Sequence, residues 1–155
     1  SAKIVVAGNH DWPFALCTPA EAKELLKNAI YLEDNGIELM GLKFWGSPWQ
    51  PWFFNWAFNL PRGHKLAEVW AKIPSDIDVL ITHSPPSGIL DKVDGVNVGC
   101  EELAKALKRI KPKLHVFGHI HQGYGQLKKD GTIYANASLR DEKYHLTNQP
   151  IIIDL

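Results

Sequence analysis

The sequence has few cysteines and no excess of charge of either sign, and both features exclude classes of protein. Only two cysteines, Cys17 and Cys100, occur in 155 residues, and they form neither a CxxC motif nor a dense framework. A disulfide-stabilised scaffold is therefore excluded, and two reduced thiols are typical of an intracellular protein. Basic and acidic residues number 17 each, so the net charge is zero. A neutral chain predicts neither a nucleic acid polymer nor an anionic membrane as its partner.

Long apolar runs are also lacking. No segment approaches the roughly 20 apolar residues of a membrane-spanning helix, and the N-terminus enters a β-like run too early for a signal peptide. We therefore expect a cytoplasmic protein without membrane contact. With 155 residues, of which 45% are hydrophobic, the chain can form a single domain, residues 1–155, around one core.

Strand-like and helix-like segments alternate along the chain and predict an α/β fold. Thr18, Pro19 and Glu21 form a capping box with proline at the first helical position, so a helix is expected to begin there. The mixture of strand–helix–strand units and hairpins suggests layers around a mixed sheet or two packed sheets. Strands are expected at residues 3–8, 40–47, 77–86, 113–121 and 149–155, helices at 18–29, 61–74 and 99–112, and hairpins turning at Asn35-Gly36 and Asp130-Gly131.

Polar residues follow three of the predicted strands. Because ligands bind beyond the carboxyl ends of strands in α/β sheets, these three loops can converge on one site. His119 and His121 are two residues apart, so in an extended backbone both rings face the same way. Imidazole and asparagine donors without thiolates suit manganese, iron or zinc. The loops contain Gly8-Asn9-His10-Asp11, Thr82-His83-Ser84 and Gly118-His119-Ile120-His121.

Each of these motifs alone has a plainer explanation. A turn with capping residues accounts for Asn9 and Asp11, and a hydrogen-bonded core histidine accounts for His83. The combination of three histidines and one asparagine at strand ends, each beside glycine or Pro-Pro, favours a common site instead. The remaining histidines are expected outside it: His64 and His145 at the surface and His115 in the core.

Six aromatic residues lie between positions 49 and 58, which is too many for one short strand. Most of these rings are expected to pack over the core. One or two, with Trp49 and Trp52 as candidates, are predicted to form a pocket wall on which a nucleobase stacks. Stacking of this kind contributes roughly 1–3 kcal/mol per base.

The three loop motifs resemble, in order and spacing, the third, fourth and fifth motifs of the calcineurin-like metallophosphoesterases. The stretches "WGSPWQPWFFNWAFNLPRG" and "HVFGHIHQGYG" resemble the metallophosphoesterase-domain-containing (MPPED-type) group more particularly. The resemblance covers essentially the whole chain. It implies a layered α/β/β/α metallophosphoesterase sandwich and a hydrolase acting on phosphodiesters, with cyclic nucleotides as candidate substrates.

The same resemblance implies a role for each site residue. Asn9, His83 and His119 match ligands of one divalent ion, and His121 matches a ligand of a second, with manganese preferred over iron or zinc. Two cations ~3.5–4 Å apart stabilise both the attacking and the leaving oxygens of phosphoryl transfer. His10 matches a histidine that contacts the phosphate and protonates the leaving oxygen. Asp11 occupies the acidic position that follows it.

The family pattern also has Asp-x-His and Gly-Asp motifs before the Gly-Asn-His motif, and this sequence contains neither. The chain is therefore expected to correspond to the C-terminal two-thirds of such a domain, truncated at its N-terminal side. Self-association through the face left uncovered is expected, together with weak activity of the chain alone. Two alternatives remain: a non-catalytic fragment with weak metal binding, and a metal-binding regulatory module that acts through protein contacts.

Overall fold

The computed structural model describes residues 2–155 of the chain. Its helices are α1 (Trp12–Ala15), α2 (Pro19–Glu24), α3 (His64–Ala71), α4 (Glu101–Ile110) and the 3-10 helix η1 (His121–Gly123). Its strands are β1 (Ile4–Val5), β2 (Ile30–Tyr31), β3 (Asn35–Leu39), β4 (Leu42–Ser47), β5 (Gln50–Pro51), β6 (Asn59–Leu60), β7 (Val79–Thr82), β8 (Lys92–Val93), β9 (Val96–Asn97), β10 (Leu114–Phe117), β11 (Gly125–Lys129) and β12 (Thr132–Asn136).

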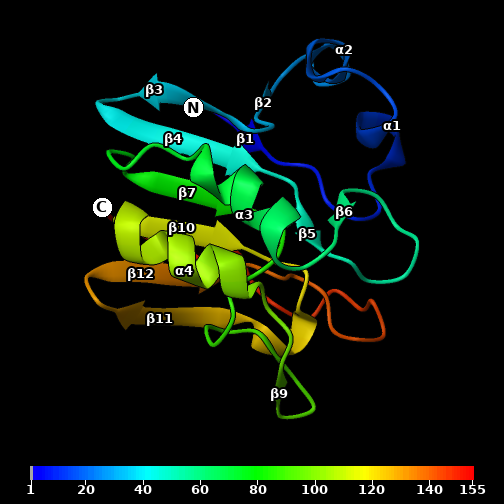
Figure 1. Cartoon of the computed structure of the whole chain (residues 1–155), viewed down its shortest axis with the longest axis vertical. Coiled ribbons are helices and arrows are strands. Elements are labelled where there is room, and N and C mark those ends of the chain that lie inside the picture. The colour runs from blue at the N-terminus through cyan, green and yellow to red at the C-terminus, as the bar shows by residue number, and fades with distance from the viewer. Residues whose placement is uncertain (1) are drawn as a thin grey trace.

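A six-stranded mixed sheet forms the centre of the molecule. Its strand order is β11-β12-β10-β7-β4-β3. The four inner strands run parallel, whereas β3 and β11 are antiparallel strands at the two edges. Helices α3 and α4 lie next to each other over one face of this sheet (Figure 1). The predicted α/β class is therefore confirmed.

The main apolar cluster lies between the two helices and the sheet. Trp70 of α3 and Leu103 of α4 are fully buried there, against Leu80 of β7 and Phe117 of β10. Helix α4 has apolar residues on one side only and basic residues in its last turn, where they interact favourably with the helix dipole. Burial of these two helices anchors the strands whose ends carry the predicted site.

A second, smaller cluster joins β1, β2 and α2 to the chain after β5. Trp49 packs against both clusters, with its ring 5.7 Å from that of Phe58 in an edge-on arrangement. Its indole nitrogen donates a hydrogen bond to Asp34 Oδ2 at 2.9 Å. The buried residues of this second cluster are Ala7, Ala22, Tyr31, Ala57 and Phe58.

The sheet face opposite the helices carries its own apolar residues. Val79, Leu114 and Ala135 are buried on this face. Ile151 and Ile153 of the C-terminal segment pack against them. Partly buried side chains on the same face are Phe44, Ile81, Val116 and Ile133.

Two of the predicted elements are wrong. Asn35-Gly36 does not turn a hairpin but lies in β3, whose hairpin partner is β4. The turn between them is at Met40 and Gly41, both with positive φ (53° and 76°), as a tight hairpin turn requires. Residues 149–155 form no strand within the described part of the chain.

The helix start at Thr18-Pro19 and the second hairpin are confirmed. Thr18 accepts a hydrogen bond from the backbone of Glu21 at 3.3 Å, and the Glu21 carboxylate accepts one from the Thr18 backbone at 2.7 Å. Strands β11 and β12 pair across Asp130-Gly131 as predicted. The predicted positions of the other histidines also hold, with His64 and His145 exposed and His115 fully buried.

Candidate metal and phosphate site

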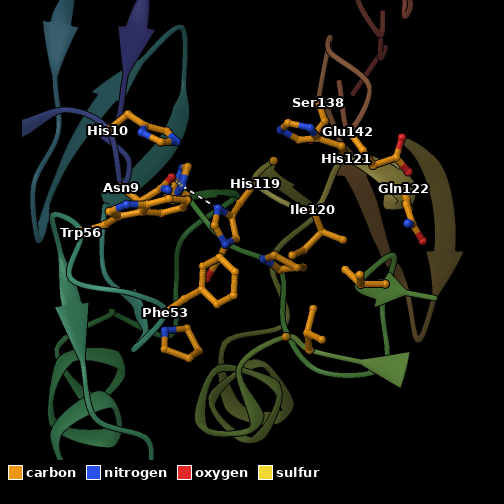
Figure 2. A pocket seen from close by; sticks show the side chains of 18 of the residues that line it. Asn9, His10, Phe53, Trp56, His119, Ile120, His121, Gln122, Ser138 and Glu142 are labelled. Atoms are coloured by element: carbon orange, nitrogen blue, oxygen red, sulfur yellow. Dashed lines mark hydrogen bonds between the residues drawn. The ribbon is translucent and has the colours of Figure 1, made fainter. Parts of the chain in front are cut away.

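Three side chains from distant parts of the chain meet at the carboxyl ends of the strands. His83 Nε2 lies 2.6 Å from Asn9 Oδ1 and 3.2 Å from His119 Nδ1. Figure 2 shows Asn9 and His119 next to each other in the pocket. Asn9 lies in the loop after β1, and His119 lies in the loop after β10. The loops that the sequence predicted to converge therefore do so in the structure.

Asn9 is buried and the two histidines are partly buried, and both histidines are neutral near pH 7. Desolvation, with smaller contributions from His119 and His10, lowers the pKa of His83 to about 3. Desolvation, followed by His121 and His10, lowers the pKa of His119 to about 4. Neutral imidazole is the form that binds metal ions.

The close approach of Asn9 Oδ1, His83 Nε2 and His119 Nδ1 is compatible with a bound cation. A neutral imidazole nitrogen carries at most one hydrogen, so His83 Nε2 cannot satisfy both Asn9 Oδ1 and His119 Nδ1 by donation. A divalent ion would use the lone pairs that remain. Among residues 2–155, no three His, Cys, Asp or Glu side chains form a group that could hold a metal ion by themselves.

Gly8 is required for this arrangement because the His83 ring packs directly on its backbone. A Cβ atom at position 8 would lie 2.5 Å from His83 Cε1 and Nδ1. Real Cβ contacts do not approach so closely, so the imidazole would have to move. Gly8, three residues after β1, is thus needed for a close approach of the imidazole to the backbone and not only for a turn.

We expect Gly8→Ala to displace His83 and to weaken manganese binding by about tenfold or more, in line with the cost of disturbing groups that orient metal ligands. Calorimetric titration with manganese measures the change. Gly118→Ala is the matched control, because a Cβ atom there meets only Ser138 Oγ, at an ordinary 3.5 Å. Equal affinities of the two variants and the unmodified chain would contradict this prediction.

His10 and Asp11 have different surroundings. The His10 ring lies 4.6 Å from the Trp56 ring, centroid to centroid, and His10 lines the same pocket as His83 and His119. Asp11 is not among the residues that line the pocket; its Oδ2 accepts a hydrogen bond of 2.7 Å from the Gly8 backbone. Asp11 therefore stabilises the turn that presents Asn9 and His10.

His119 and His121 are not in an extended backbone, so that part of the prediction is wrong. His119 has a positive φ of 67°, and His121 begins the 3-10 helix η1. Both residues nevertheless line the pocket (Figure 2). His121 Nδ1 lies 2.7 Å from the backbone oxygen of Asp141, 20 residues further along the chain.

The pocket has a volume of about 700 Å³ and one aromatic wall. Aromatic rings of the chain after β5 form this wall, including Trp52, but Trp49 is not part of it. The rest of the lining mixes polar residues with apolar ones such as Val93, Val98 and Ile120, and Glu142 is the only carboxylate among the described residues that line the pocket. Lining residues that the sequence did not single out include Phe53, Trp56, Gln122, Ser138, Arg140, Glu142 and Tyr144.

A buried hydrogen-bond chain supports the loop that carries His83. Thr82 Oγ1 donates to the backbone oxygen of Ser84 at 2.8 Å. Its remaining contact, with His115 Nε2 at 2.9 Å, therefore requires His115 to donate. Burial lowers the pKa of His115 to about 3, so this histidine is a neutral structural group.

Sequence comparison agrees with the geometry of this site. The family model of the calcineurin-like phosphoesterases matches residues 1–123, which include all three motif loops. The chain belongs to the calcineurin-like phosphoesterase family. This family comprises metal-dependent hydrolases that use divalent ions.

Within the family, the chain is similar to the MPPED-type group, as its sequence predicted. It is 44% identical to metallophosphoesterase domain-containing protein 1 of Homo sapiens, over 99% of this chain and 55% of that protein. It is 51% identical to UPF0046 protein T07D4.2 of Caenorhabditis elegans, over 86% of this chain and 34% of that protein. The chain thus spans about half the length, or less, of these curated relatives.

Solved structures support the fold. One crystal structure superposes with a TM-score of 0.66 and 22% identity, covering 87% of this chain and 56% of the other. The crystal structure of TT1561 of Thermus thermophilus superposes with a TM-score of 0.54 and 17% identity, covering 87% of this chain and 62% of the other. No helix in residues 2–155 is long and apolar enough to cross a membrane.

Proposed function

We propose that this chain provides metal-binding and phosphate-facing residues of a phosphodiesterase, with small phosphodiesters such as cyclic nucleotides as substrates. The observation that carries this proposal is the convergence of three polar side chains at the edge of one pocket. His83 Nε2 lies 2.6 Å from Asn9 Oδ1 and 3.2 Å from His119 Nδ1. His10 and His121 line the same pocket. The free thiols of Cys17 and Cys100 are compatible with a reducing compartment such as the cytoplasm.

Asn9, His83 and His119 would hold one divalent ion, and His121 would contribute to a second, with manganese preferred over iron or zinc. When bound, such cations supply the positive charge that stabilises the attacking and leaving oxygens in phosphoryl transfer. The residues of this chain orient the phosphate and exclude water from the aromatic side of the pocket. The neutral imidazoles of His83 and His119 keep this site free of competing protons near pH 7.

His10 would transfer a proton to the leaving oxygen. It is exposed at the pocket and is not one of the three crowded donors, so its ring nitrogens remain available to a substrate. Contact with the Trp56 ring at 4.6 Å restricts its orientation. General acid catalysis by a positioned histidine contributes about 10²–10⁴-fold.

The aromatic wall of the pocket favours a substrate that carries a planar group. Trp52 and Phe53 are 59% and 49% exposed although they line a pocket. Their loop is held by Asn59, whose Nδ2 donates to the backbone oxygens of Phe53 and Phe54 at 3.3 and 2.9 Å. Exposed rings on a fixed loop suit base stacking, and this favours a nucleotide phosphodiester.

Manganese binding tests the metal-binding part of this proposal. We expect calorimetry to detect one weak site, because the described donors are neutral and lack a carboxylate, and we expect His83→Ala combined with His119→Ala to abolish it. His64→Ala is the control, since His64 is exposed and its only described partner is Glu68. Binding that survives the double substitution would refute the assignment of these ligands.

A second candidate function is a non-catalytic metal-binding module. The observation that favours it is the neutral donor set, since Glu142 is the only carboxylate among the described residues lining the pocket. Such a module would bind manganese but would not hydrolyse a phosphodiester, either alone or fused to an added N-terminal segment. Activity measurements therefore separate the two candidates.

We also propose that the chain self-associates through the sheet face opposite the helices. Phe44, Ile81, Val116 and Ile133 are only partly buried there, and exposed apolar surface of this kind favours association. Size-exclusion chromatography with light scattering is expected to show species larger than a monomer. Val116→Thr and Ile81→Thr should shift the distribution toward monomer, and a single monomer peak for the unmodified chain would contradict the proposal.

A further inference from the structure

A compact turn built around Asp141 lies against His121. The Asp141 carboxylate atom Oδ1 accepts hydrogen bonds from the backbone of Lys143 and of His145, at 2.9 and 2.8 Å. The Asp141 backbone N–H donates to the His145 oxygen at 3.0 Å, and the Tyr144 N–H donates to the Asp141 oxygen at 3.0 Å. Arg140 Nη1 closes the turn by donating to the Tyr144 oxygen.

The turn presents its Asp141 carbonyl to the His121 ring. The oxygen lies 2.7 Å from His121 Nδ1, and the Tyr144 ring stands perpendicular to the His121 ring at 5.4 Å. A carbonyl oxygen can only accept a hydrogen bond, so His121 must carry its hydrogen on Nδ1. Its Nε2 then keeps a free lone pair, which is the form required of a metal ligand.

We infer that Asp141 is a positioning residue that fixes the ring orientation and the tautomer of His121. Its side chain organises the turn, and its carbonyl then receives the Nδ1 hydrogen. Outer partners of this kind orient metal-binding histidines in other proteins. The inference rests on the proposed function for the metal-binding role of His121, but the tautomer itself is a property of the metal-free chain.

Three variants separate the side chain of Asp141 from its backbone. Asp141→Ala removes both carboxylate oxygens: the two backbone hydrogen bonds to Oδ1 are lost, and so is the 3.2 Å contact of Oδ2 with His145 Nδ1. Asp141→Asn keeps an oxygen that accepts both bonds and is the conservative rescue. Lys143→Ala is the matched control, because only the backbone of Lys143 takes part in the turn.

Two-bond proton–nitrogen NMR spectra at pH 8 report the tautomer, with the His121 signals assigned from their loss in His121→Gln. We expect the Nδ1–H form in the unmodified chain, Asp141→Asn and Lys143→Ala. In Asp141→Ala the ratio of the Nδ1–H to the Nε2–H form should fall by about three- to tenfold, as expected from losing the support of a hydrogen bond. An Nε2–H form in the unmodified chain, or no change in Asp141→Ala, would overturn the inference.

Zinc titration, followed on the same His121 signals, tests the proposed function separately. Zinc is expected to shift the Nε2 signal, with a half-saturating concentration raised about tenfold in Asp141→Ala and restored in Asp141→Asn. A tautomer that responds to Asp141 without any response to zinc would support the positioning role of Asp141 while refuting a metal at His121. A zinc response that is identical in all variants would overturn the positioning role.

Discussion

Hydrolysis of bis-p-nitrophenyl phosphate by this chain alone is expected to stay close to background, even with manganese present. Asn9, His83 and His119 form a neutral donor set, and anionic ligands are needed to hold two cations together. Adding an N-terminal segment that carries Asp-x-His and Gly-Asp motifs should raise the manganese-dependent rate by orders of magnitude. The physical reason is that two cations stabilise both the attacking and the leaving oxygens.

The appropriate control is the same fusion with the added aspartates changed to alanine, which should return the rate to background. Manganese content, measured on each purified protein, shows whether the rate follows metal occupancy. Full activity of the chain alone would mean that other residues complete the site. No activity in a fusion that binds two manganese ions would favour the non-catalytic module.

His10→Ala in the active fusion is expected to lower turnover by about 10²–10⁴-fold, the usual contribution of a positioned general acid. Metal content should not change, because His10 is not one of the three crowded donor residues. The assay is turnover of a substrate with a poor leaving group, for which protonation of the leaving oxygen matters most.

Two further variants serve as controls for His10→Ala. His64→Ala should leave turnover unchanged, because His64 is an exposed residue of helix α3. His121→Ala should lower both turnover and manganese content. A loss of metal in His10→Ala would show that His10 is itself a ligand and would contradict the role of proton donor.

The sequence predicted the strand ends and the three loop motifs because their signals are local. Gly8, His83 and His119 each follow a short apolar run that forms a strand. Strands β7 and β10 run parallel in the six-stranded sheet, so His83 and His119 reach the same edge of it, whereas Gly8 follows β1 of the separate β1–β2 sheet. The hairpin at Asn35-Gly36 failed for an equally local reason. Asn35 Oδ1 accepts the Glu33 N–H at 2.8 Å, so the side chain shapes the bend before β3 instead of the turn of a hairpin.

Residues 149–155 lack the predicted strand because burial alone produces their alternating pattern. Ile151 and Ile153 alternate with exposed Ile152 since they pack on the sheet face, without pairing as a strand within the described residues. The hydrogen bond of His121 Nδ1 could not be predicted from the sequence. Its partner is the backbone oxygen of Asp141, and every residue type has such an oxygen. Trp49 packs against both apolar clusters whereas Trp52 is 59% exposed and lines the pocket, and this difference depends on tertiary packing that residue type does not report.

Because the proposed metal-binding residues are divided between two apolar clusters, partial unfolding of one cluster is enough to separate them. His83 and His119 follow β7 and β10 of the six-stranded sheet, whereas Asn9 follows β1, whose small sheet is stabilised by the second cluster. Proteins open in cooperative units that follow such boundaries. Detachment of the β1–β2 unit would dismantle the three-residue site while the six-stranded sheet stayed folded. Hydrogen exchange should then be faster at Leu32, whose N–H pairs with Val5, than at the inner strands, and a bound metal ion should slow it by linking the two units.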